Sequence, residues 1–184
     1  MVQLKKLVLI SLLFLNHSVF AAGKFDIMGG FYSLKAQANN KSGSLTGPGS
    51  YMATYSYHFI SHLDFTVSYS LFFSGVVTGD MGFGPDLGFT YFPFSSSAPI
   101  NFKGEFESVN YRDSLRPFVN VSFNQRQFQS VDSAYAGFSG SIGTEYYWNS
   151  LFDLKGLFRY QMLNGPEKST GSYFDFLLGV TLSI

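Results

Sequence analysis

The chain has 184 residues, and its twelve basic residues are balanced by twelve acidic ones. This balance offers no basic excess for binding nucleic acid, and the absence of cysteine excludes a disulfide framework or a thiolate metal site. Aromatic residues, mostly Phe and Tyr, make up 19% of the chain, and residues of high strand propensity occur along its whole length.

Residues 1–21 have the pattern of a secretory signal peptide that is cleaved. Lys5 and Lys6 give a basic start, residues 7–15 form a short apolar core, and Val19-Phe20-Ala21 places small residues where a signal peptidase reads them. The apolar core is too short for a spanning helix of about twenty residues, so an uncleaved anchor is the less favoured alternative. We therefore assign residues 22–184 to one exported domain.

Eight segments of this domain alternate between apolar and polar residues, which is typical of strands with one apolar face. They span 25–36, 50–60, 62–73, 81–93, 117–128, 135–148, 151–163 and 172–184. The last is the clearest, because one parity from Phe174 to Ile184 is wholly apolar. We assign the apolar parity of every segment to the outside and place no charge there. Such a surface fits lipid, because a charge facing the centre of a bilayer is costly.

Strands in lipid must close into a barrel, because hydrocarbon cannot satisfy the hydrogen bonds of an open edge. Bacterial barrels have an even number of strands, with both termini on the periplasmic side. The sequence therefore predicts an all-β fold: a membrane-spanning, up-and-down antiparallel barrel of eight strands in meander order. Its predicted outer loops are 37–49, 74–80, 129–134 and 164–171, and its predicted periplasmic turns are 60–62, 94–116 and 149–151.

Two segments fit this pattern poorly. Residues 100–106 alternate and could form a ninth strand, but an odd number breaks the rule, so we expect a periplasmic excursion, for which a hairpin arm is one form. Pro85 cannot donate to a strand ladder. We therefore expect a bulge at Pro85, or a fourth strand that starts later.

Two motifs resemble those of known outer-membrane barrels. The last strand resembles their C-terminal assembly signal, with Gly179 followed by apolar Leu182 and Ile184, although phenylalanine is usual in place of Ile184 and a polar residue in place of Leu177. Residues 115–119, Leu-Arg-Pro-Phe-Val, resemble the Arg-Pro-aromatic-Val motif that opens a strand in OmpA-, OmpX- and OmpW-like small barrels. The resemblance implies an eight-stranded barrel in the outer membrane of a Gram-negative cell. We expect its partners to be outer-membrane lipids, lipopolysaccharide and, through the last strand, the barrel assembly machinery, and we expect a monomer.

The inward parity predicts a polar network inside the barrel. Its members are Asp26, His58, Asp64, Asp86, Arg126, Glu145, Asp153, Lys155, Arg159 and Asp175. Buried charges need partners, and the turn lengths predict three cross-strand pairs: Glu145 with Lys155, Arg159 with Asp175, and His58 with Asp64. Six acids outnumber three bases in this set, which we interpret as an indication of water inside.

The first interpretation of function is a non-enzymatic barrel with a mostly plugged interior, which is structural or allows limited passage or binding of small solutes. An eight-stranded barrel is just wide enough to be filled by its own side chains. A gated narrow pore or proton path along the same ion pairs is a sharper alternative. A surface interaction or adhesion protein acting through its outer loops is a further one.

An outer-membrane lipid-modifying enzyme is the third interpretation, and we disfavour it. The exported domain has two histidines, His58 and His62, and both lie at the first periplasmic turn, far from the outer leaflet. Their spacing suits a metal site only on a helix, whereas this segment is a predicted hairpin. We therefore assign no catalytic, metal or cofactor site.

Overall fold

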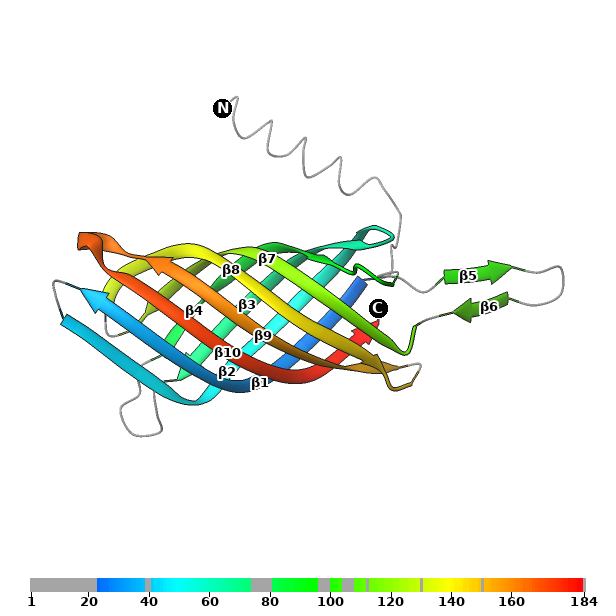
Figure 1. Cartoon of the computed structure of the whole chain (residues 1–184), viewed down its shortest axis with the longest axis horizontal. Helices are drawn as coiled ribbons and strands as arrows, with labels where there is room; N and C mark the ends of the chain where they lie inside the picture. Colours follow the sequence, from blue (N-terminus) through cyan, green and yellow to red (C-terminus); the bar gives the residue numbers. More distant parts are fainter. Residues whose placement is uncertain are drawn as a thin grey trace, which may run out of the picture.

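Eight antiparallel strands close into a barrel in this protein, whose computed structural model describes residues 23–38, 41–73, 81–95, 100–103, 108–111, 113–129, 131–149 and 151–183 (Figure 1). The barrel strands are β1 (Gly23–Ala38), β2 (Lys41–Ile60), β3 (Leu63–Phe73), β4 (Met81–Tyr91), β7 (Leu115–Phe128), β8 (Val131–Tyr147), β9 (Phe152–Asn164) and β10 (Thr170–Ser183). Neighbours in this order pair with each other, and β1 pairs with β10 to complete the ring. The predicted eight-stranded meander is confirmed. The predicted signal peptide lies outside the described residues.

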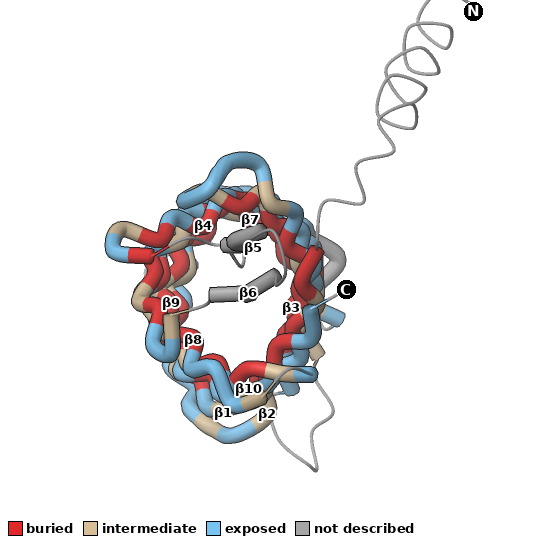
Figure 2. Tube along the Cα trace, turned by 90° about the vertical axis from the view of Figure 1, so that its right-hand side faces the viewer, coloured by how far each residue is buried: buried red, intermediate tan, exposed pale blue. Residues whose placement is uncertain are grey.

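Buried and exposed residues alternate along the barrel strands, as expected for a wall with an inner and an outer face (Figure 2). In β10, Asp175 and Leu177 are buried, whereas Phe176 and Leu178 are exposed. On the outside, Phe138 and Ile142 of β8 are 67% and 62% exposed, and exposed apolar side chains occur on all eight barrel strands. A soluble monomer rarely exposes so continuous an apolar surface, so the outer wall has the character that the sequence pattern predicts for contact with lipid.

Lys35 contradicts the expectation that the outward face carries no charge. It is exposed and shares the outward parity of Phe31 on β1. Lys35 lies four residues beyond Phe31, near the end of the strand. The apolar outer face of β1 therefore ends before the strand does, and alternation alone does not mark where that change occurs.

The outer loop predicted at 37–49 is wrong, because this segment is mostly strand. β1 and β2 remain paired as far as Ala38 opposite Lys41. The pairing shifts between Gly30 and Phe31, where Gly49 is the extra residue of a bulge on β2. Gly49 has a φ of 113°, a conformation that glycine adopts without strain. This turn-forming residue marks a bulge within β2, at the ninth residue of the strand.

The other outer loops and turns differ less from the prediction. A pairing shift after His58 brings Ile60 opposite Leu63, so two residues, not three, join β2 to β3. β8 already begins at Val131, which shortens the predicted 129–134 loop, and the 164–171 loop contains a single 3-10 turn, η1 (Pro166–Lys168). Residues 74–80 lie outside the described residues. No helix in the described part of the chain has the length and hydropathy needed to cross a bilayer.

The expected bulge or late start at Pro85 is wrong. β4 passes through Pro85 opposite Tyr69 of β3, and its pairing with β7 keeps one register on both sides, with a gap at Gly84 and Pro85. A Cβ on Gly84 would lie 1.9 Å from the carbonyl oxygen of Gln125, so glycine permits the close approach of the two strands here. Arg126 Nη1 donates to the carbonyl oxygens of Gly84 and Pro85, at 3.3 Å each. The side chain of Arg126 thus donates to backbone carbonyl oxygens at the point where the pairing between β4 and β7 is interrupted.

The excursion predicted at 94–116 contains a separate hairpin. β5 (Ile100–Lys103) pairs with β6 (Ser108–Tyr111) in a two-stranded sheet of their own. The chain therefore leaves the barrel after β4 and returns at β7, and the ninth-strand alternative is excluded for the residues described there.

Candidate functional site

The predicted polar network lies inside the barrel, and its charges form two clusters separated by an apolar layer. Nine of its ten members are buried, and His58 is half-buried. The order can be followed along β9, where Asp153 and Lys155 are followed by Leu157 and then by Arg159. We call the cluster around Glu145 the first ionic cluster and the one around Asp86 the second ionic cluster.

Glu145 is the centre of the first ionic cluster. Its Oε2 accepts hydrogen bonds from Lys24 Nζ at 3.1 Å and from Arg116 Nη2, and its Oε1 lies 3.2 Å from Lys155 Nζ. Three cations from three other strands therefore meet one carboxylate. Ion pairs that are hydrogen-bonded in this way are stronger than neutral hydrogen bonds.

Each of these three cations also contacts a second acid. The pairs are Lys155 Nζ with Asp26 Oδ2 at 2.6 Å, Arg116 Nη2 with Asp153 Oδ2 at 3.1 Å, and Lys24 Nζ with Asp64 Oδ2 at 3.7 Å. Asp64 also contacts His58, whose Nδ1 lies 2.7 Å from Asp64 Oδ1. The predicted pairs of Glu145 with Lys155 and of His58 with Asp64 are thus confirmed in register and in contact.

The second ionic cluster joins two arginines to two aspartates. Arg159 binds Asp175 with two nitrogens, Nε at 3.1 Å and Nη2 at 2.5 Å, which confirms the third predicted pair. Arg159 Nη1 also lies 3.1 Å from Asp86 Oδ2, and Arg126 Nη1 lies 2.5 Å from Asp86 Oδ1. Asn124 donates to Asp86 as well, at 2.7 Å. The carboxylate of Asp86 is therefore neutralised and hydrogen-bonded on both oxygens.

Sequence reasoning missed Lys24 and Arg116. Both are 1% exposed inside the barrel, with the same parity as Asp26 and Phe118 on their strands. The predicted segments began at residues 25 and 117, one position too late to include them. Their parity was the signal that could have found them. With Lys24 and Arg116 included, five bases face six acids inside the barrel. Most of the acidic surplus therefore disappears, and it no longer serves as an indication of water inside.

Apolar side chains pack against both ionic clusters in two groups. The first group consists of Met28, Met52, Phe92, Phe118, Leu157 and Leu177. In it, the ring centroids of Phe92 and Phe118 are 5.8 Å apart, and Lys24 Nζ lies 4.7 Å from the ring centroid of Phe92. Beyond the second ionic cluster, Tyr32, Phe72 and Tyr173 form the second group, with ring centroids of Phe72 and Tyr173 4.8 Å apart. Charged and apolar side chains therefore fill the barrel together.

A small cavity lies between the two ionic clusters. It has a volume of about 30 Å³ and is lined by charged side chains of both clusters, by hydroxyl and amide side chains, and by Met28, Met52, Phe118 and Leu157. One buried water molecule needs roughly 10–15 Å³ of such space. The cavity can therefore hold about two water molecules, but it is far smaller than a small-ligand site of about 300 Å³ or more.

The two histidines have separate structural contacts. His58 contacts Asp64, whereas His62 Nδ1 lies 2.7 Å from the carbonyl oxygen of Ser95 and 3.2 Å from that of Phe92. His62 therefore fixes the segment that carries Phe92 into the barrel. Within the described ranges, no group of three or more metal-binding side chains is placed to hold an ion.

Comparisons with known proteins identify the fold. No family model and no curated protein matches the chain. Neisserial surface protein A matches 87% of this chain and 97% of its own, with 15% identity and a TM-score of 0.58. Ail, the attachment invasion locus protein of Yersinia pestis, matches 87% and 99% with 12% identity and a TM-score of 0.44, and the outer membrane protease OmpT of Escherichia coli matches 89% and 97% with 6% identity and a TM-score of 0.45. The chain thus has the fold of small eight-stranded outer-membrane barrels.

Proposed function

We propose that the protein is an integral, non-enzymatic barrel of the Gram-negative outer membrane, with a structural role and a closed interior. The observation that carries this proposal is the contrast between the two faces of the wall: apolar side chains outside, and ionic clusters inside with apolar closures between and beyond them. The charged groups inside are already engaged with one another, so they stabilise the barrel rather than await a substrate. We further propose that the protein is a monomer, assembled by the barrel assembly machinery through β10.

The closed interior predicts that the pure protein conducts little. In planar lipid bilayers, we expect no large, steady channels, because ionic clusters and apolar side chains fill the interior and the cavity between the clusters has space for only about two water molecules. The measurement is single-channel recording on protein whose folding is verified by heat-modifiable gel mobility. Large, long-lived openings from folded protein would refute the plugged interior and favour the pore alternative.

A second candidate, a surface interaction protein, is favoured by the length of the β1–β2 hairpin. β2 pairs with β3 only between Ser50 and Ile60, so residues 41–49 extend beyond the last paired residue of β3. Leu34 lies opposite Leu45, so a two-residue turn in place of residues 35–44 shortens the hairpin without changing the register below it. This removal should abolish binding to a cell or ligand while the barrel still folds. Unchanged binding after this removal would leave the structural role as the better proposal.

A further inference from the structure

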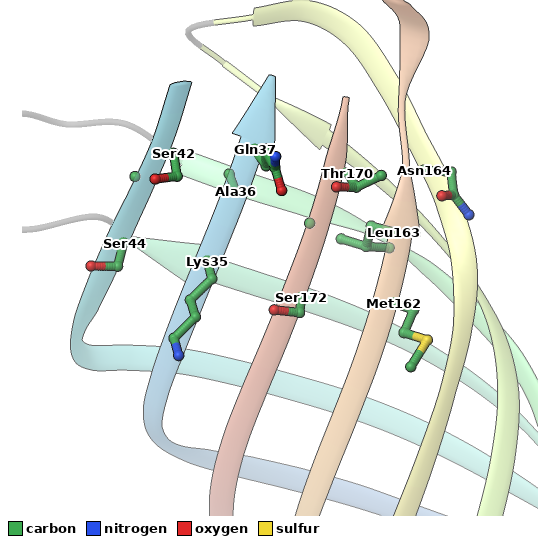
Figure 3. A pocket seen from close by; sticks show the side chains of 12 residues that line it. Lys35, Ala36, Gln37, Ser42, Ser44, Met162, Leu163, Asn164, Thr170 and Ser172 are labelled. Carbon is green, nitrogen blue, oxygen red and sulfur yellow. The ribbon is translucent and has the colours of Figure 1, made fainter. Parts of the chain in front are cut away.

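A hollow of about 580 Å³ lies where the ends of β2, β1, β10 and β9 meet, at the end of the barrel opposite Phe92 (Figure 3). Its polar lining includes the side chains of Lys35, Gln37, Ser42, Ser44, Thr170 and Ser172. Among the described residues that line it, Lys35 is the one charged side chain, and none of them is a carboxylate that would repel an anion. Its volume falls within the range of small-ligand sites, about 300–1,000 Å³.

Strand register explains why these polar groups lie together. Lys35 of β1 lies opposite both Ser44 of β2 and Ser172 of β10. Gln37 likewise lies opposite Ser42 and Thr170. Side chains opposite each other on neighbouring strands project from the same face, so Lys35, Ser44 and Ser172 form one polar row on the wall, and Gln37, Ser42 and Thr170 form a second row beside it.

The hollow begins where the apolar outer face ends. On β10, Ser172 is followed by Phe174 and Phe176, and on β1, Lys35 comes four residues after Phe31. The rings of Tyr160 and Phe174 lie next to this boundary, with centroids 4.4 Å apart. Aromatic side chains form a girdle at the headgroup level of outer-membrane barrels. A bilayer that covers the apolar outer wall would therefore place Lys35 just beyond its hydrocarbon, at the level of lipid headgroups.

We infer that this hollow binds the phosphorylated saccharide headgroup of lipopolysaccharide, an inference that rests on the proposed location in the outer membrane. An ammonium group binds phosphate as a compact point charge. Hydroxyl and amide side chains can both donate to and accept from the hydroxyl groups of a sugar. The aromatic side chains next to the hollow would contact the acyl chains of the same lipid. One lipopolysaccharide molecule would thus contact both the polar hollow and the apolar wall.

The test is a binding titration of the full chain in detergent micelles with phosphorylated lipid A, read by native mass spectrometry. Lys35→Gln is expected to weaken binding about tenfold or more, because hydrogen bonds to charged groups contribute about 1.5–3 kcal/mol. Lipid A without phosphates should bind the unmodified protein as weakly as phosphorylated lipid A binds the variant. Lys168→Gln is the matched control, because Lys168 is exposed in η1 but does not line the hollow, and it should leave binding unchanged.

Equal binding by the unmodified protein and Lys35→Gln would overturn the inference, as would indifference to the lipid phosphates. Competition by inorganic phosphate at the same concentration as the lipid would overturn the assignment to a lipid. Heat-modifiable mobility and membrane fractionation of every variant separate this failure from a failure of the proposed function. If the barrel is folded and inserted in the membrane but does not bind lipid A selectively, the headgroup site alone is overturned. If the chain folds in water without detergent, the membrane barrel itself is overturned.

Discussion

Replacing Glu145 with Gln is expected to reduce the free energy of unfolding by about 3–5 kcal/mol, because it leaves buried cations without their shared counter-charge. Lys24, Arg116 and Lys155 all contact this carboxylate, and Glu145 is 1% exposed. Glutamine keeps the volume of the side chain and one acceptor oxygen, so the loss in the free energy of unfolding reports the removal of the negative charge. The measurement is urea unfolding in lipid vesicles, followed by the fluorescence of Trp148, the single tryptophan of the chain.

Two further variants make the result specific to Glu145. Glu167→Gln removes a carboxylate that is exposed in η1, and it should change stability by less than about 0.5 kcal/mol, as exposed substitutions generally do. Adding Lys24→Met to Glu145→Gln removes one of the three cations that lose this carboxylate and should restore part of the lost stability. If Glu145→Gln were as stable as Glu167→Gln, the first ionic cluster would not stabilise the barrel.

Replacing Ile142 with Arg is expected to destabilise the barrel by about 2–4 kcal/mol in lipid vesicles, because a lipid-facing arginine near the bilayer midplane is costly. Ile142 is 62% exposed on the outer wall and lies opposite Val119 of β7 and Phe158, the central residue of β9. In water, the same exposed substitution would change stability by no more than about 0.5 kcal/mol. The effect of this one substitution therefore distinguishes lipid from water as the solvent of the outer wall.

Gln127→Arg is the matched control for this experiment. Gln127 is exposed on the outward parity of β7, one residue before the end of the strand, where an arginine reaches the headgroups and costs at most about 1 kcal/mol. Urea unfolding of both variants in the same vesicles gives the difference between their free energies of unfolding. Equal stability of the two would contradict a bilayer around the middle of the wall.

Most of the fold could be predicted from the sequence because the side-chain period of a strand is two and short turns fix the register. This is why the pairs of Glu145 with Lys155 and of Arg159 with Asp175 could be predicted from turn lengths alone. The start of β2 could not be predicted, because the turn-forming residue Gly49 lies in a bulge that depends on the pairing with β1. Alternation shows the face of a residue but not where a strand ends, and Lys24 and Arg116 were missed for that reason.

Contacts across the interior lay beyond such reasoning. Lys24 on β1 reaches Glu145 on β8, and Arg159 on β9 reaches Asp86 on β4. These strands are not neighbours in the barrel, so no register connects the residues. The contacts depend on the diameter of the closed barrel and on the length of each side chain. The sequence indicates which charges face inward, but it does not indicate which of them meet across the centre.

The pairing of Lys24 with Glu145 has a consequence for biogenesis. The two residues are separated by 121 positions, and their strands become close only when the sheet has rolled up and its first and last strands have joined. Before closure, Glu145 can still meet Arg116 and Lys155, which lie on the strands next to its own, but not Lys24. Joining the first and last strands therefore completes the first ionic cluster, and an inward charge that lacks its partner is costly in hydrocarbon until then. Such distant contacts also predict slow maturation, because their loop-closure entropy is lost before they can stabilise anything.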